Sequence, residues 1–433
     1  MGFRSSYADP DVWLRAANRL DGRPYYEYLL VYVDDIIIIS EVAKEILQQM
    51  KDSYGYLLKD IGEPKSYLGA DIGRQQGTYG DTWSLSPNTY VNKAIMTVEG
   101  RFGSLKTMFG RNMCNTPAPT TFHPELDNTA FLGLDETQLY QSYIGILRWA
   151  VELGRIDITH VTATLAKFMS NPREGHLKAV IRVFAYLKKR PKAHIIMDTD
   201  DLIIDIDNTN NGYRDNISQQ HWSQFYEGIE ETTPANAPPP RGQAVSINMF
   251  CDAAHATDLI TRRSTTGIIF FLFNTPIIWY AKRQNTIESS TFGSEFVALR
   301  IASELNDALR YKLRMFGIPI TEPTRTYCDN ESVVKNATIA TSTLTKKHNS
   351  IAYHKVRECV AQKSIEIHFI QSKGNIADFL TKFLPHAQHD MCCNATIWRQ
   401  RPQHASYWAS EGTARNRPYN KESETYKGHE TRE

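Results

Sequence analysis

Two adjacent aspartates, Asp34 and Asp35, interrupt the strongly apolar run "YLLVYVDDIIIIS" at residues 28–40. They could simply be turn residues, since aspartate is common in turns. A tight hairpin tip, however, favours Asn-Gly or Asp-Gly, and here isoleucine follows the second aspartate directly. Adjacent carboxylates repel each other unless a cation neutralises them, and Mg²⁺ prefers hard oxygen ligands. The run therefore predicts a hairpin of two buried strands whose tip carries either turn residues or magnesium ligands.

The segments around this pair must position it. Residues 22–40 have the pattern of strands, and residues 137–190 have the apolar periodicity of helices. One such helix is expected to begin with Asn171 as its cap and Pro172 at its first position. Residues 198–232 then carry nine acidic residues against one basic residue, and the Pro-rich stretch 234–242 follows. We expect a solvated linker and a domain boundary at 198–244.

The region 245–385 has a different pattern. It contains 17 Lys and Arg against 12 Asp and Glu, a local net charge of +5, whereas the whole chain has +1. Short strand-like runs and amphipathic helices follow in the order β-β-β-α-β-α-α-β-α, and Gly317 is expected to end the long helix. This order predicts a mixed α/β architecture, a sheet flanked by helices. Beyond residue 386 the chain becomes polar, which predicts a mostly disordered tail over 386–433.

Compartment and membrane association are constrained by composition. The six cysteines are scattered without a CxxC pair, which favours reduced thiols in an intracellular protein. No apolar run approaches 18 residues and no signal peptide opens the chain, so we expect no membrane span. The stretch "HAQHDMCC" offers His386, His389, Cys392 and Cys393, but its tight spacing disfavours a zinc site.

Several of these segments resemble one protein family. "YVDDIIIIS" resembles the polymerase palm motif of reverse transcriptases, and the segments 57–72, 84–91, 140–150 and 171–188 resemble copia-type retrotransposons. The resemblance covers roughly residues 1–385 and implies the C-terminal part of a retrotransposon polyprotein. It implies the end of a palm over 1–75, a mostly helical thumb-like or connection-like region over 76–197, the linker, a ribonuclease H-like domain over 245–385 and the tail.

The polymerase half is incomplete by this comparison. In the family, a third metal-binding aspartate and the nucleotide-binding fingers precede the YVDD motif. The upstream residues Asp9, Asp11 and Asp21 do not lie in such a motif. Two-metal phosphoryl transfer needs a complete carboxylate set. We therefore expect RNA-directed DNA polymerase activity, on a template-primer nucleic acid, only of a full-length parent.

The ribonuclease H half matches the resemblance at four acidic positions: Asp252, Glu295, Asp329 and Asp378. The resemblance implies that they hold two Mg²⁺ ions, with Mn²⁺ as a substitute, at about 4 Å from each other. In that assignment Asp252 bridges both ions, Glu295 and Asp329 hold one, and Asp378 helps to hold the other. Taken singly, each acid could be a surface residue, and Asp329 in "DNES" could cap the next helix.

An RNA/DNA hybrid would also need phosphate contacts and groups that sense 2′-hydroxyls. The candidates are Arg262, Arg263, Ser264, Thr265, Lys282, Arg283, Lys346 and Lys347. A solvated basic face is the alternative for each of them. The expected activity is magnesium-dependent cleavage of RNA in such hybrids, with other parts of the polyprotein as possible partners.

Two other functions compete with this expectation. One is a catalytically silent, nucleic-acid-binding remnant of a decayed element. The other is an integrase, which the YVDD motif and the "ADFLTK" ending disfavour. By family, the chain would work in a cytoplasmic virus-like particle or in the nucleus.

Overall fold

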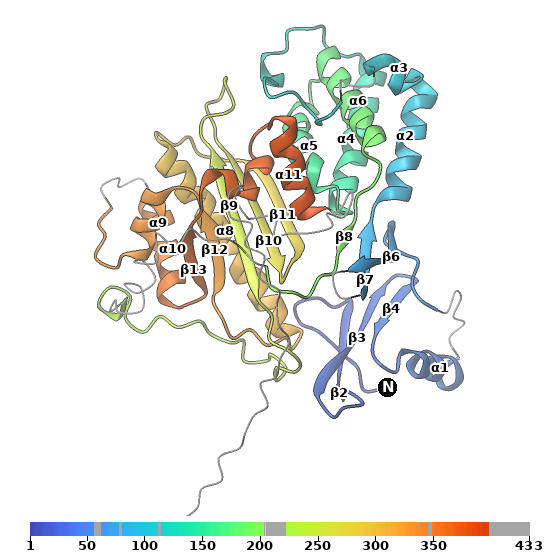
Figure 1. Ribbon diagram of the computed structural model, residues 1–433, viewed down its shortest axis with the longest axis vertical. Helices are drawn as coiled ribbons and strands as arrows, with labels where there is room; N and C mark the ends of the chain where they lie inside the picture. Colours follow the sequence, from blue (N-terminus) through green and yellow to red (C-terminus); the bar gives the residue numbers. More distant parts are fainter. Residues whose placement is uncertain are drawn as a thin grey trace, which may run out of the picture.

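A computed structural model describes residues 1–55, 62–77, 80–110, 114–202, 204, 222–344 and 349–397. Within these ranges the chain forms three sheets with helices packed around and between them (Figure 1). The first sheet has the order β1-β2-β3-β4, the second β5-β6-β7-β8, and the third β11-β10-β9-β12-β13. The expected mixed α/β architecture is confirmed.

The first sheet is an antiparallel meander of β1 (Arg4–Ser5), β2 (Val12–Asn18), β3 (Pro24–Tyr32) and β4 (Asp35–Ile39). The helix α1 (Ala43–Tyr54) packs Ile46 and Met50 against Leu29. β3 and β4 form the expected hairpin, with Tyr32 opposite Asp35. The expectation of two buried strands is wrong for β4. Its three central residues are only partly buried and its two end residues, Asp35 and Ile39, are exposed.

The second sheet consists of β5 (Ser66–Tyr67), β6 (Ala70–Gly77), β7 (Gly80–Ser86) and β8 (Ile195–Ile196). β6 crosses the boundary expected at residue 75, because it pairs with β7 along its whole length. The helices that follow share one apolar core around Ile144, Leu147 and Phe184. They are α2 (Asn88–Phe102), α3 (Leu105–Phe109), α4 (Leu134–Glu152), α5 (Thr159–Leu165) and α6 (Glu174–Lys189), with 3₁₀ turns η1 (Pro124–Leu126), η2 (Ile156–Ile158) and η3 (Ala166–Phe168).

The start expected for the last of these helices is wrong. α6 begins at Glu174, with Arg173 as its N-cap, rather than at Pro172. Arg173 has an extended backbone and forms an isolated β-bridge with Phe131. The helix can therefore start only after Arg173.

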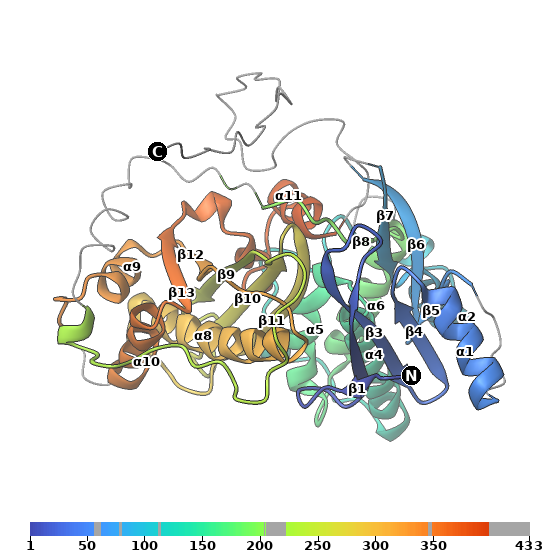
Figure 2. The same cartoon turned by 90° about the horizontal axis from the view of Figure 1, so that it is seen from below.

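The third sheet follows the element order expected from the sequence. Its elements are β9 (Ile247–Ala254), β10 (Thr265–Leu272), β11 (Thr275–Arg283), α8 (Thr291–Met315), β12 (Thr324–Cys328), α9 (Glu331–Thr338), α10 (Ser350–Ala361), β13 (Ile365–Phe369), and the 3₁₀ turns η7 (Ser372–Gly374) and η8 (Ile376–Leu380). β9 pairs antiparallel with β10 and parallel with β12. α8 and α10 lie on one side of the sheet, and a further helix, α11 (His386–Thr396), lies on the other (Figure 2). Gly317 has φ +72° just after α8, as expected for a helix stop.

The expected disordered tail is wrong at its start, because residues His386–Thr396 form α11. Cys392, Cys393 and the following Ile397 are buried in the core shared with Phe250 and Leu380. Although this segment is mostly polar in sequence, its few apolar residues lie on one side and pack against the adjacent face of the sheet. The rest of the expected tail, 398–433, lies outside the described residues.

The acidic segment is also less solvated than expected where it is described. Glu231 forms ion pairs with Arg310 at 2.6 Å and with Arg314 at 2.5 Å, both on α8. Arg357 of α10 stacks over Trp222 and Tyr226, of which Trp222 begins the 3₁₀ turn η5 (Trp222–Gln224). Trp222, Tyr226 and Glu231 therefore dock the described end of this segment against α8 and α10.

Hydrogen bonds join the first and third sheets to helices of other parts of the fold. The Tyr28 hydroxyl donates to the Phe316 carbonyl at 2.8 Å, which joins the first sheet to the end of α8. The Trp279 indole on β11 donates to the Val151 carbonyl of α4 at 3.1 Å. None of the helices in the described ranges is long and apolar enough to cross a membrane.

Candidate active site

Four acidic side chains from four elements meet at one edge of the third sheet. Asp252 lies in β9, Glu295 in α8, Asp329 directly after β12 and Asp378 in η8. Carboxylate oxygens of Asp252, Asp329 and Asp378 all lie within 4.8 Å of one another, and Glu295, Cys328 and Asp329 form a second such group. Asp252, Glu295 and Asp378 are only 1%, 4% and 5% exposed. The structure thus brings together the four acids predicted from the sequence.

Local capping explains how each acid is aimed. Ser290 caps α8 by accepting a hydrogen bond from the Gly293 amide at 3.3 Å, which places Glu295 near the start of the helix. Asn330, rather than Asp329, caps α9 by accepting from Val333 at 3.2 Å. Asn330 therefore occupies the N-cap position that was the alternative role for Asp329. Asp329 instead faces the other carboxylates.

The turn η8 is fastened to β9 by Asn375. Its side-chain amide donates to the Cys251 carbonyl at 2.9 Å, and its side-chain oxygen accepts from the Ala377 amide at 3.1 Å. Gly267 of β10 lies opposite Asp252 and lets η8 come close. A Cβ at Gly267 would lie 2.9 Å from the Ala377 carbonyl oxygen. The missing side chain at this position thus sets the depth at which Asp378 sits.

Two residues that the sequence did not single out contact the carboxylates. The Lys382 ammonium lies 2.8 Å from Asp378 Oδ1 and 3.2 Å from Asp252 Oδ2. The Thr381 hydroxyl donates to Asp252 Oδ2. Both belong to the "ADFLTK" segment, and the spacing of four residues between Asp378 and Lys382 was a usable signal.

The crowded carboxylates hold protons more tightly than isolated ones. Burial and the nearby Asp252 raise the pKa of Asp378 to about 7, although Lys382 opposes this shift. Burial, with Cys328 and Asp252 as neighbours, raises the pKa of Glu295 well above its usual range. Burial and Asp252 also raise the pKa of Asp329. These shifts share one cause, negative charge gathered away from water.

The residues fit a divalent cation. Glu295 Oε2 is buried and has no hydrogen-bond partner among the described residues. The two groups of potential ligands share Asp329 and offer carboxylate oxygens, the ligands that Mg²⁺ and Mn²⁺ prefer. A cation here would relieve both the unpaired oxygen and the mutual repulsion.

The palm aspartates are arranged differently. Asp34 and Asp35 are exposed at the β3–β4 hairpin, where Val33 adopts φ +51°. Within the described residues, no group of three ligand side chains as close as those above includes either of them. Among the described residues the pair therefore has no close third ligand, which agrees with the missing third motif in the sequence.

The expected nucleic-acid contacts divide into three sets. Arg263, Thr265, Lys282 and Arg283 line one cleft beside β11. Arg262 is exposed outside that cleft, and Ser264 is fully buried, where its hydroxyl accepts from the Ala256 amide at 3.1 Å and so fixes the loop. Lys346 and Lys347 lie outside the described residues.

The histidines and cysteines of "HAQHDMCC" lie on different faces of α11. His386 is on the outside, with its ring 3.4 Å from Asp390, whereas His389, Cys392 and Cys393 are buried. His389 Nδ1 lies 3.5 Å from Cys393 Sγ. His389, Cys392 and Cys393 therefore act as packing residues of α11.

The chain is 25% identical over 401 residues, 90% of its length, to the retrovirus-related Pol polyprotein from transposon TNT 1-94 of Nicotiana tabacum. The homologues of this chain are copia-type retrotransposon Pol polyproteins. That from transposon RE1 of Arabidopsis thaliana is 24% identical over 88% of the chain. The chain spans about a quarter of the length of these Pol polyproteins, 25% and 22% respectively.

Other matches are shorter. A putative transposon Ty5-1 protein of Saccharomyces cerevisiae is 25% identical over 59% of the chain and 66% of its own length. Among solved structures, the N-terminal RNase H domain of a Mycobacterium tuberculosis protein covers 35% of the chain and 99% of itself, with 12% identity and a TM-score of 0.25. RNase H1 of Halobacterium salinarum covers 31% of the chain and 94% of itself, with 16% identity and a TM-score of 0.24. No protein-family model matches the chain.

Proposed function

We propose that this chain hydrolyses the RNA strand of RNA/DNA hybrids in a magnesium-dependent reaction, as a ribonuclease H fragment of a retrotransposon Pol polyprotein. The observation that carries the proposal is the meeting of Asp252, Asp329 and Asp378, with Glu295 beside them, at one sheet edge. Phosphodiester hydrolysis needs this concentration of negative charge to hold its metal ions. Homology to Pol polyproteins supports the choice of nucleic acid as substrate.

The side chains at this site have three different roles in the proposed reaction. Asp252, Glu295, Asp329 and Asp378 would hold the ions, with Asp252 and Asp329 at the centre of the set. Bound Mg²⁺ supplies an activated water and a stabilised leaving oxygen. Thr381 fixes the orientation of Asp252 by donating to its Oδ2. The part-exposed Lys382 ammonium lies between Asp252 and Asp378, where it can meet a phosphate oxygen of the substrate.

Polymerisation is assigned to the longer parent alone. The exposed Asp34 and Asp35 lack a close third ligand among the described residues, and this supports the assignment. Template-primer nucleic acid and other parts of the polyprotein would then be partners of the parent, in a cytoplasmic particle or in the nucleus.

The test is cleavage of a hybrid with end-labelled RNA by the purified chain with Mg²⁺, beside Asp252→Asn. Cleavage by the wild type and its loss, by a factor of a hundred or more, in the variant would support the proposal. If neither protein cleaves while both are folded and bind the hybrid, the chain is the silent nucleic-acid-binding remnant instead. A DNA duplex of the same sequence serves as the control substrate and should stay intact.

A further inference from the structure

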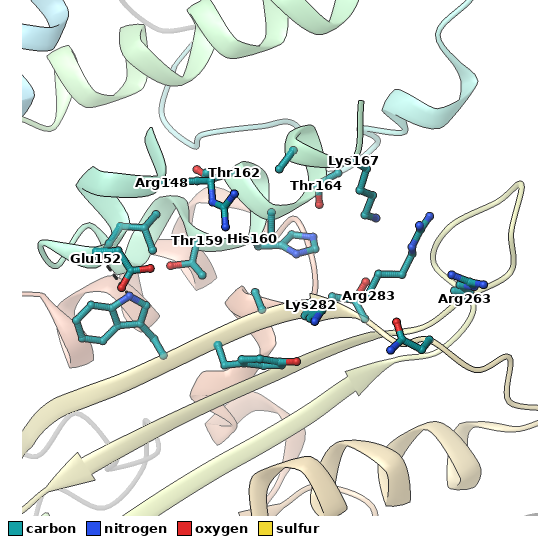
Figure 3. A pocket seen from close by; sticks show the side chains of 18 residues that line it. Arg148, Glu152, Thr159, His160, Thr162, Thr164, Lys167, Arg263, Lys282 and Arg283 are labelled. Carbon is teal, nitrogen blue, oxygen red and sulfur yellow. Dashed lines mark hydrogen bonds between the residues drawn. The ribbon is translucent and has the colours of Figure 1, made fainter. Parts of the chain in front are cut away.

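A cleft of about 540 Å³ lies between the α4–α5 region and the edge strand β11. Figure 3 shows its two walls, with Arg148, Thr162 and His160 on one side and Lys282 and Arg283 on the other. The walls belong to regions separated by more than a hundred residues in the sequence. The Trp279–Val151 hydrogen bond joins them at one end of the cleft. A space of this size lies within the usual range of ligand-binding clefts.

The cleft is positively charged. Its lining includes the basic residues Arg148, Lys167, Arg263, Lys282 and Arg283, against one acidic residue, Glu152. Asp258 partly neutralises two of them, since it lies 3.0 Å from Arg283 and 3.9 Å from Lys167. Arg148 and Lys282 are exposed and have no ion pair within the described part of the chain. They remain available to an anionic ligand.

The floor of the cleft holds unsatisfied polar atoms. Thr159 Oγ1, His160 Nδ1 and Thr162 Oγ1 are buried and lack hydrogen-bond partners among the described residues. These residues are 7%, 8% and 2% exposed, and the His160 ring points into the space facing β11 (Figure 3). Burial and the nearby Lys167 lower the pKa of His160 to about 3, so the ring is neutral. Neutral acceptors and hydroxyls beside cations match a ligand that carries both phosphates and hydroxyl groups.

Part of the cleft lies on the sheet face that carries the carboxylates, whereas Lys282, which pairs with Thr266 on the edge strand β11, alternates to the other face. Thr265, which lines the cleft, lies two residues before Gly267 on β10, and Gly267 is opposite Asp252. Side chains two residues apart on a strand point the same way, about 7 Å from each other. The His160 ring also packs at a tilt against Phe383, next to Lys382, with ring centroids 4.4 Å apart. The Thr265 end of the cleft therefore lies near the carboxylates.

We propose that this cleft binds the sugar–phosphate backbone of the RNA strand, with Arg148 and Lys282 on its phosphates and the Thr159, His160 and Thr162 side chains on its 2′-hydroxyls. The inference rests on the proposed function and adds to it a binding site built jointly by the helical region and the third sheet. It makes the helical region part of substrate recognition.

The test is fluorescence anisotropy with a labelled RNA/DNA hybrid and a DNA duplex of the same sequence, in EDTA so that no cleavage occurs. Arg148→Ser/Lys282→Ser should weaken hybrid binding about tenfold and reduce the slope of log Kd against log salt by about two. The matched control is Lys93→Ser/Lys178→Ser, which removes two exposed lysines of α2 and α6 and should change neither quantity. Circular dichroism checks that every variant is folded.

Thr162→Val tests the hydroxyl contacts with almost no change in volume. It should weaken hybrid binding several-fold and leave binding of the DNA duplex unchanged. Unchanged hybrid affinity and salt slope in the Arg148/Lys282 variant would overturn the proposal. An equal loss for both duplexes in Thr162→Val would overturn its 2′-hydroxyl part.

These outcomes separate the two proposals. If the wild type cleaves hybrids but the cleft variants bind and cleave like wild type, the proposed binding site is wrong and the proposed ribonuclease activity is retained. If the cleft variants lose hybrid affinity but the wild type never cleaves, the binding site stands and the ribonuclease activity fails.

Discussion

Gly267 lies directly opposite Asp252 in the β9–β10 pairing, and a Cβ on it would come within 2.9 Å of both the Ala377 carbonyl oxygen and Leu380 Cβ. No real Cβ contact is that short, and one of the two atoms is backbone. The turn that carries Asp378 can therefore reach Asp252 only because this strand position has no side chain.

Gly267→Ala should displace η8 and separate Asp378 from Asp252. We expect a loss of hybrid cleavage by at least tenfold and a decrease of about 1–3 kcal/mol in the free energy of unfolding. Gly145→Ala in α4 is the control, because a Cβ there meets nothing within 4 Å and should stabilise the helix slightly. Urea denaturation and the cleavage assay measure both. Wild-type activity in Gly267→Ala would contradict the packing argument.

Mg²⁺ should stabilise the folded chain through the four carboxylates. At a concentration of 100 times its Kd, the gain is about 2.7 kcal/mol, seen as a rise in melting temperature. Asp252→Asn should abolish most of this rise. The double variant Asp34→Asn/Asp35→Asn should keep it, because those exposed aspartates lack a close third ligand in the described part. An equal loss in both variants would show that the metal effect is not specific to this site.

Glu231→Gln should release the docked end of the acidic segment. Burial opposes ionisation, but hydrogen bonds from Arg310 and Arg314 dominate and lower the pKa of Glu231 to about 2. Its stabilising effect is therefore full above the unfolded-state value near 4.5 and is lost as the pH falls towards 2. At pH 7 the variant should lose about 1–3 kcal/mol of stability. Thermal unfolding of Glu231→Gln beside Glu230→Gln, an exposed neighbour, should show this loss at pH 7 for Glu231 only.

Ile397→Ala should show that the chain after residue 385 is part of the fold. Ile397 is fully buried, so the cavity should cost about 2–5 kcal/mol. Met391→Ala on the preceding helix α11 changes a residue that is 39% exposed and should cost far less. Denaturant titration of the two variants compares them. Equal stability would contradict the docking of α11.

Local patterns were enough to predict much of this structure. Strand alternation, helix periodicity and the stop at Gly317 gave the order of elements in the third sheet, since these features depend on neighbours in sequence. The contacts of Lys382 with Asp252, and the cleft floor at His160, depend on which distant segments pack together. The burial of Cys393 was missed for the same reason, because its partners lie on a sheet face far away in sequence.

The Asn375–Cys251 hydrogen bond joins residues 124 positions apart. During synthesis from the N-terminus, β9 leaves the ribosome long before η8 exists. A nascent or prematurely ended chain therefore has Asp252 without Asp378, and cannot gather the carboxylates that hold a cation. The order of translation thus delays assembly of the carboxylate site. Nucleic acid near the ribosome meets a complete site only after nearly the whole described chain has emerged.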